Sequence, residues 1–129
     1  MDYDNHSIIS GALVSSLSIR KEEGRVATNE CEAFRLRTNR GLLSIWVDID
    51  TDEICLKVKR GFNQASDDFE HCINREYPFV GQRVGWSWYG RNQQGYRDVL
   101  MLAFGKAALT PQLLLLAEAS RIRLLRITE

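Results

Sequence analysis

The sequence predicts a mainly β fold, at the margin of the α+β class. Two similar four-strand antiparallel units are expected to form a sandwich or a barrel, joined by one short helix. Three observations lead to this prediction. Apolar and polar residues alternate along several stretches of the chain. Turns rich in glycine, asparagine or charged residues separate those stretches. The order of elements in residues 11–60 returns in residues 81–128.

The first half of the chain contains four stretches with strand character. ALVSSLSIR ends at the polar turn KEEG. In EAFRLRT, Phe34, Leu36 and Thr38 share one face. Arg35 and Arg37 share the opposite face. The strands LLSIWVDI and ICLKVKR are expected to point a further set of side chains inward: Leu43, Ile45, Val47, Ile49, Ile54, Leu56 and Val58.

A change of pattern predicts a helical linker over residues 61–80. Ser66 suits an N-cap position. Asp67 and Asp68 suit the first turn of a helix, where carboxylates interact favourably with the helix dipole. We therefore expect one short helix near Ser66–Asn74, bridging the two halves.

The second half resumes the strand pattern, with one ambiguous element at residues 112–119. In VGWSWYG, Val84, Trp86 and Trp88 are expected to share one face. The Thr-Pro pair before QLLLLAEAS is typical of a helix start, and leucine, alanine and glutamate favour helix. The comparison between the halves instead matches this stretch to the strand LLSIWV, so we predict a strand.

The chain length of 129 residues fits one domain. Residues 11–129 are expected to form it, with pseudo-repeats at 11–60 and 81–128. Residues 1–10 are polar and expected to be frayed. The second pseudo-repeat is the more apolar one. Either its strands are buried on both faces or a surplus apolar face forms a homodimer.

Composition excludes several classes of protein. The 17 basic and 17 acidic residues sum to zero net charge, which argues against a dedicated nucleic-acid-binding protein. Cys31, Cys55 and Cys72 form no CxxC motif, so we expect no disulfide framework and no zinc site, but reduced thiols in a cytoplasmic protein. No apolar run reaches the roughly 18 residues of a membrane span, and the acidic N-terminus does not resemble a signal peptide.

Catalytic motifs are absent from the sequence. Gly-rich phosphate loops, HExxH and GxSxG do not occur. His71 and Cys72 are neighbours on the predicted helix, where adjacent side chains point about 100° apart, so they do not form a nucleophile–base pair. We expect no catalytic residue and no cofactor.

The turn DIDTDE carries four carboxylates within six residues: Asp48, Asp50, Asp52 and Glu53. Alternate carboxylates are typical of calcium loops, but an EF-hand needs glycine at its sixth position and glutamate at its twelfth. Here Glu53 and Lys59 occupy those positions. The turn is either an exposed hairpin turn or a site for a small molecule or divalent metal, and no metal ligand is assigned.

The segment RNQQGYRD lies between an aromatic stretch and an apolar one. Its amides and glycine suit a tight turn. Aromatic and arginine residues are also frequent anchors of protein interfaces. The candidate binding residues of this hairpin are Trp86, Trp88, Tyr89, Arg91, Asn92, Gln93, Gln94, Gly95, Tyr96 and Asp98.

Three predicted strands carry alternating basic residues: Arg35, Arg37, Lys57, Lys59, Arg121 and Arg123. Neighbouring strands would join them into a basic stripe able to hold single-stranded nucleic acid. The neutral net charge instead favours a solvated sheet face.

Two segments, VDIDTDEICL and VGWSWYGRNQQGYRDVLMLAF, resemble a family of small bacterial proteins classified as a domain of unknown function. Its members carry a D-x-DTDE turn and a W-x-W…NQQGY-x-D segment. The resemblance covers roughly residues 11 to 128 and implies a bacterial cytosolic domain, but it transfers no activity. It marks as site residues Asp48, Asp50, Asp52, Glu53, Trp86, Trp88, Asn92, Gln93, Gln94, Gly95, Tyr96 and Asp98.

We therefore expect a non-catalytic module, of an immunity-like or accessory kind, that binds a protein partner through the aromatic hairpin 86–98. The alternatives are a small-molecule or metal-dependent function at the acidic turn 48–53, and single-stranded nucleic-acid binding by the Arg-rich strands.

Overall fold

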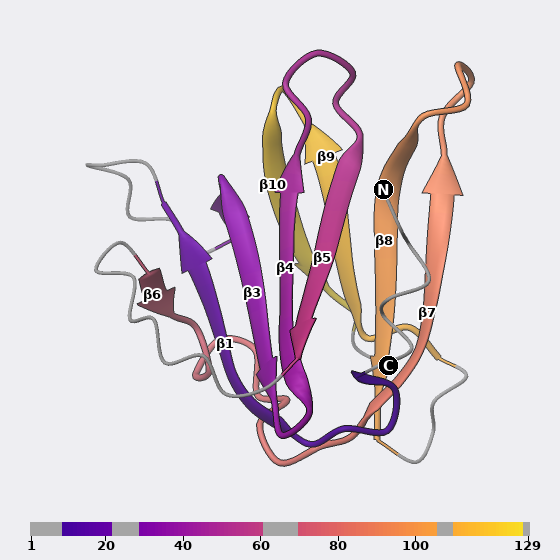
Figure 1. Ribbon diagram of the computed structural model, residues 1–129. Helices are drawn as coiled ribbons and strands as arrows, with labels where there is room; N and C mark the ends of the chain where they lie inside the picture. The colour runs from indigo at the N-terminus through magenta and orange to yellow at the C-terminus, as the bar shows by residue number, and fades with distance from the viewer. Residues whose placement is uncertain (1–8, 22–28, 61–69, 106–109, 128–129) are drawn as a thin grey trace.

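The computed structural model describes residues 9–21, 29–60, 70–105 and 110–127. Two five-stranded antiparallel sheets face each other as a sandwich rather than closing into a barrel (Figure 1). The strands are β1 (Val14–Arg20), β2 (Glu30–Cys31), β3 (Ala33–Thr38), β4 (Gly41–Val47), β5 (Ile54–Arg60), β6 (Glu70–Cys72), β7 (Val84–Arg91), β8 (Arg97–Phe104), β9 (Leu113–Glu118) and β10 (Arg121–Arg126).

The first sheet has the order β5-β4-β3-β1-β6. Four of its strands form the meander predicted from the first half of the sequence. The tight turn between β3 and β4 depends on Thr38 and Gly41. The Thr38 hydroxyl accepts a hydrogen bond from the Gly41 N–H at 3.0 Å. A Cβ on Gly41 would lie 2.7 Å from the Lys59 carbonyl oxygen, so only glycine fits there.

The second sheet has the order β2-β10-β9-β8-β7. Strands β7 to β10 form the second meander, and the two-residue strand β2 from the first half completes the opposite edge. In contacts between the layers, β5 packs over β8, and β10 packs over β3 and β4. The sandwich prediction is therefore confirmed.

The prediction of two four-strand units joined by a short helix is wrong. Each sheet gains a fifth strand from outside its own meander: β6 joins the first sheet and β2 joins the second. Within the predicted helix Ser66–Asn74, residues 70–72 form β6 and pair with β1. Residues 66–69 lie outside the described residues. Backbone pairing with β1 overrides the local helix signals, because an edge strand satisfies its hydrogen bonds through the ladder.

The ambiguous segment is a strand, as the comparison between the halves predicted. Leu113–Glu118 pairs with β8 on one side and β10 on the other. The Thr-Pro start and helix-favouring composition are overridden, because Leu113 and Leu115 are fully buried between the sheets. Burial of large aliphatic side chains contributes roughly 1.5–3 kcal/mol each, more than the difference in helix propensity.

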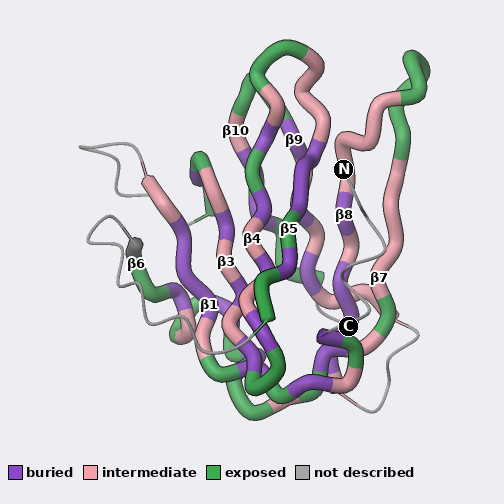
Figure 2. Tube along the Cα trace, in the orientation of Figure 1, coloured by how far each residue is buried: buried purple, intermediate pink, exposed green. Residues whose placement is uncertain are grey.

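The core lies between the inner faces of the two sheets, where buried and less buried residues alternate along the strands (Figure 2). Phe79 and Phe104 stack with ring centroids 4.3 Å apart. Ile9, from the segment expected to be frayed, is also buried there. One predicted inward residue is wrong: Ile49 is 78% exposed, because β4 ends at Val47 and Ile49 belongs to the following turn.

A β-bulge in β7 corrects the predicted face of the tryptophans. Val84 pairs with Phe104, but Ser87 pairs with Leu102, so β7 contains one extra residue between them. The extra residue inverts the alternation. Val84 points inward, whereas Trp86 and Trp88 lie on the outer face, contrary to the prediction of one shared face.

Candidate functional site

The tip of the β7–β8 hairpin is held by Asn92 and Gly95. The Asn92 side-chain oxygen accepts hydrogen bonds from the backbone N–H groups of Gln94 at 2.9 Å and Tyr96 at 3.2 Å. Gly95 has a φ of 85°, which glycine adopts without strain. These two predicted binding residues therefore have a role in the turn itself. Gln93 and Gln94 are exposed at the tip.

The aromatic residues of the hairpin divide between two faces. Tyr89 packs against the core and lies beneath the guanidinium of Arg97, 5.4 Å from the ring centroid. Trp86 is 61% exposed on the outer face, and Trp88 is half-buried there. Tyr96 and Asp98 are half-buried, and Arg91 is exposed. The structure does not bring all the predicted hairpin residues to one surface.

A continuous apolar row crosses the outer face of the second sheet. Trp88 lies opposite Met101, and Leu114 lies between Met101 and Leu125. Directly opposite residues share one face of a sheet. The row therefore spans β7, β8, β9 and β10 without a polar side chain. Leu125 is 43% exposed, and the other three are half-buried.

The next row along this face continues the apolar surface and then becomes charged. Val99 lies opposite Leu116, and Leu116 lies opposite Arg123. Arg123 forms an ion pair of 3.7 Å with Glu118, between two exposed side chains. We call the six residues Trp88, Val99, Met101, Leu114, Leu116 and Leu125 the apolar outer face.

The apolar outer face was only partly predictable. The uninterrupted leucines of β9 indicated that both faces of this strand are apolar, and the sequence therefore predicted burial or a surplus face. Which side chains of β7 join it depends on the bulge, which has no clear sequence signal beyond Gly85.

The acidic turn connects the two sheets. The Asp52 carboxylate accepts a hydrogen bond from the Ser120 N–H, at the β9–β10 turn, at 2.7 Å. The Glu53 carboxylate accepts one from the Arg97 N–H, at the start of β8, at 3.2 Å. Asp48 caps its own turn by accepting a bond from the Asp50 N–H. We call this arrangement the acidic clasp.

The acidic clasp bears on the metal hypothesis. Its carboxylates accept backbone hydrogen bonds from three different segments, so their oxygens have structural partners. In the part of the chain that the structure describes, no group of three or more His, Cys, Asp or Glu side chains is placed to hold a metal ion. No observation of the geometry favours metal chemistry at this turn.

The six basic residues of the predicted stripe lie on two different sheets. Arg35, Arg37, Lys57 and Lys59 occupy the outer face of the first sheet, whereas the two arginines of β10 lie on the second. The condition for one continuous stripe, that all three strands are neighbours, is therefore not met, because β10 belongs to the other sheet from β3 and β5. On β10, the Arg121 guanidinium lies 3.5 Å from the Glu30 carboxylate.

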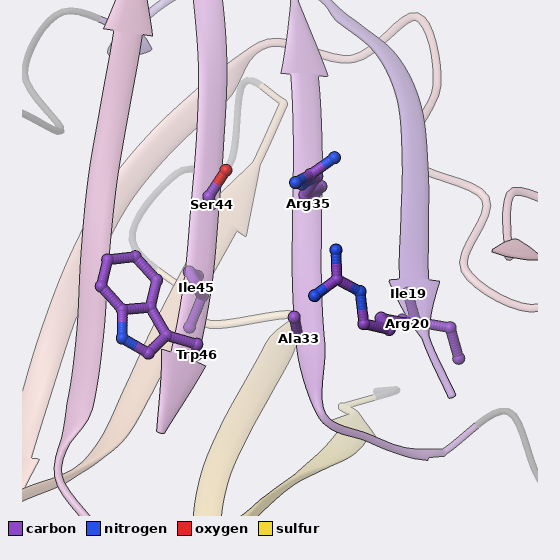
Figure 3. A pocket seen from close by; sticks show the side chains of 7 residues that line it. All are labelled: Ile19, Arg20, Ala33, Arg35, Ser44, Ile45 and Trp46. Atoms are coloured by element: carbon purple, nitrogen blue, oxygen red, sulfur yellow. The ribbon is translucent and has the colours of Figure 1, made fainter. Parts of the chain in front are cut away.

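A shallow groove of about 170 Å³ opens on the outer face of the first sheet. Its lining includes Arg20, Ala33, Arg35, Ser44 and Trp46 (Figure 3). The Trp46 ring lies on one side of Ala33, and the Arg20 side chain reaches toward Ala33 from the other side. The sequence prediction did not include this groove, because nothing local distinguishes Trp46 from the strand around it.

The cysteines are free thiols in different environments. Burial, together with the nearby Glu30 charge, raises the pKa of Cys31 to about 12. Burial also raises the pKa of Cys55, which faces outward beside Trp46 in the register. Cys72 is exposed at the edge of the first sheet. His71 and Cys72 do not face each other, because adjacent residues of β6 point to opposite faces.

None of the described segments contains a helix with the length and apolar character needed to cross a membrane. A family model described as "Family of unknown function (DUF6334)" matches residues 1–129. The chain belongs to this family, and the predicted resemblance to a domain of unknown function is confirmed at that level. No curated protein and no solved structure matches the chain.

Proposed function

We propose that this member of the DUF6334 family is a non-catalytic interaction module that binds a protein partner through the apolar outer face. The observation that supports this function best is the row formed by Trp88, Met101, Leu114 and Leu125 across four strands. When a partner removes such a group of apolar side chains from water, the free energy of the system falls, which favours binding.

The composition of this surface matches that of protein interfaces. Interface centres are enriched in tryptophan and methionine and depleted of charge, whereas their rims are polar. Here Trp88 and Met101 lie near one side of the row, and the Glu118–Arg123 ion pair lies at its border. Exposed Trp86 extends the surface along β7.

The hairpin tip is the second part of the proposed interface. Gln93 and Gln94 are exposed, and their side chains supply donors and acceptors beyond the apolar outer face. Asn92 and Gly95 shape this tip rather than contacting the partner. The partner is a protein bound in an immunity-like or accessory role.

The test compares three folded proteins as baits in the native cell extract. The double variant Trp88→Ser/Leu125→Ser makes both ends of the apolar row polar, and Leu42→Ser makes an apolar-to-polar change on the outer face of the first sheet. Removal of a tryptophan that anchors an interface typically costs about 2 kcal/mol or more of binding free energy. We expect wild type and Leu42→Ser to retain the same proteins, measured by quantitative mass spectrometry, and the double variant to lose them.

Circular dichroism first establishes that each bait is folded. Equal retention of the same proteins by the double variant would contradict the proposal. Sedimentation of the purified chain separates the homodimer alternative, because a concentration-dependent dimer lost in the double variant identifies a second copy as the partner.

The proposal includes the cell compartment. The three cysteines are free, and Cys31 and Cys55 are buried as thiols. Free thiols are typical of a reducing compartment. We place the protein in the bacterial cytoplasm, with the motif resemblance as the reason for a bacterial origin. Cell fractionation with a specific antibody tests this location, and recovery in the membrane or secreted fraction would contradict it.

A further inference from the structure

We propose that the outer face of the first sheet binds single-stranded nucleic acid, with one base seated over Ala33 between Trp46 and Arg20. This site uses neither the apolar outer face nor the hairpin. A test of this site therefore has an outcome that does not depend on the proposed protein interaction.

The seat for the base follows from the strand register. Arg20 of β1 lies opposite Ala33 of β3, and Ala33 lies opposite Trp46 of β4. Adjacent strands are about 4.8 Å apart, so the Arg20 and Trp46 Cα atoms flank Ala33 across about 10 Å. The small Ala33 side chain leaves the space over β3 open, and the Trp46 ring, which extends from β4 on the side away from Ala33, is 38% exposed (Figure 3). Indole and guanidinium groups both stack on the flat face of a base.

The phosphate contacts follow from the next two rows. Ser44 lies between Arg35 and Lys57, and Leu42 lies between Arg37 and Lys59. Successive rows are about 7 Å apart along a strand. Cations therefore border the groove on both sides and continue beyond it in a direction that an extended sugar–phosphate backbone can follow.

Within its four long strands, the first sheet carries only basic charges, although the chain as a whole is neutral. The strands β1, β3, β4 and β5 contain no aspartate or glutamate. Acidic residues border the site beyond the strand ends: Asp48 follows Trp46 by two residues and pairs with Glu53, and Glu70 of β6 lies opposite Arg20 in the register. Arg20, Arg35 and Arg37 also take part in other interactions within the fold. A guanidinium has five N–H donors, so a ligand phosphate can share it.

A polymer fits this site better than a small molecule does. Pockets that enclose a drug-sized ligand have volumes of about 300–1,000 Å³. The groove measures about 170 Å³ and is open to solvent, so it accommodates one ring but not a whole ligand. The exposed side chains of Lys57 and Lys59 continue the positive surface, which favours a polyanion.

The experiment measures fluorescence anisotropy of a labelled single strand of about 12 nucleotides, as RNA and as DNA, with a duplex and heparin as comparisons. The variants are Trp46→Ala, Lys57→Gln/Lys59→Gln, and Trp86→Ala as a matched tryptophan control on the other sheet. Each titration is done at about 50 mM and about 200 mM salt.

We expect wild type and Trp86→Ala to bind the single strand equally and more weakly at higher salt. Trp46→Ala should weaken binding about tenfold, the effect of losing one stacked base. The double lysine variant should reduce the slope of log K against log salt by about 1.4, which is 0.7 for each lost phosphate contact. Either RNA or DNA as the tighter ligand supports the site and identifies its natural class.

Three outcomes would overturn the proposal. One is no salt-sensitive binding at the lower salt concentration. Another is equal affinity of Trp46→Ala and Trp86→Ala for the single strand. The third is binding of the duplex or heparin as tight as that of the single strand, which would mean that no base is recognised. If Trp46→Ala fails to fold, Ala33→Leu replaces it, because a leucine fills the seat and should weaken binding to a similar degree.

Discussion

The outer faces of the two sheets differ, although their inner faces are alike. Each sheet contains a four-strand antiparallel meander whose inward side chains are aliphatic or aromatic. Outside, the central row of the first sheet is Arg35, Ser44 and Lys57. On the second sheet the corresponding surface is a row of one tryptophan, one methionine and two leucines.

The folding of the sandwich does not account for this difference in polarity between the two outer faces. Packing between the sheets requires complementary apolar side chains only on the inner faces. An outer face exposed to water is usually polar. The first sheet follows this rule with a basic bias. The second departs from it, and such departures are typical of binding surfaces.

The largest effect is expected inside the sandwich and tests whether the apolar outer face is a surface or a second core. Phe104→Ala removes a fully buried ring stacked on Phe79, and it should lower the free energy of unfolding by about 3–5 kcal/mol. Met101→Ser, on the outer side of the same strand, should cost less than about 1 kcal/mol. Urea denaturation measures both. A similar loss for Met101→Ser would show that the outer face belongs to the core.

The next largest effect concerns the cysteine thiols of the two short edge strands, β2 and β6. Cys31 of β2 is buried, and burial raises its pKa to about 12, whereas Cys72 of β6 is exposed. The folded state holds the Cys31 thiol neutral while the unfolded chain ionises it near pH 9. Stability is therefore full below pH 9 and falls between about pH 9 and pH 12, by at most about 1.4 kcal/mol per pH unit.

Urea denaturation at several alkaline pH values measures this fall. Cys31→Ala should make the fall shallower, and Cys72→Ser should leave it unchanged. A fall that is identical in wild type and Cys31→Ala would contradict the burial of this thiol. At neutral pH, a thiol reagent should react with Cys72 and not with Cys31 in the folded protein.

A smaller effect tests whether the acidic clasp holds the two faces in their relative positions. Asp52→Ala removes the carboxylate that accepts the Ser120 N–H, and it should cost about 1 kcal/mol. Amide hydrogen exchange at Ser120 should become faster. Asp50→Ala, a change at an exposed neighbour, should alter the free energy of unfolding by less than about 0.5 kcal/mol. It should leave the exchange rate at Ser120 unchanged. Unchanged exchange at Ser120 in Asp52→Ala would show that this hydrogen bond does not hold the acidic turn against the β9–β10 turn.

The smallest effect concerns the tryptophans on the outer faces. Trp86→Ser should change stability by less than about 0.5 kcal/mol, because this side chain is 61% exposed. Trp86 should also contribute most of the fluorescence quenched by acrylamide, ahead of Trp46 at 38% exposure. Quenching that stays the same in Trp86→Ser would mean that a bound partner or second copy covers this part of β7.

Much of the fold could be predicted because alternation along a strand is a local property. The inward sets of β3 and β5 and the strand assignment of Leu113–Glu118 are confirmed on this basis. The bulge at Gly85–Trp86 could not be predicted. It depends on where β7 must pair with β8, and one extra residue moves Trp86 and Trp88 to the other face.

The candidate sites were predictable in residue type and less so in position. The acidic turn was recognised as unusual, but its role appears only when Ser120 and Arg97, far along the chain, are brought to Asp52 and Glu53. The Arg-rich strands were recognised, but the groove required Trp46, whose neighbours across the sheet come from three other strands.

The sequence alone determined the class of fold, the two meanders and most of the inner face of each strand. Successive side chains of a strand point to opposite faces, so consecutive residues show the pattern directly. Tertiary structure decided the rest. It recruited β2 and β6 to the sheet edges, separated the basic residues between two layers, and turned the tryptophans outward. These features depend on hydrogen-bonded pairing between distant segments, whose free energy exceeds the local preferences that favoured a helix or an uninterrupted alternation.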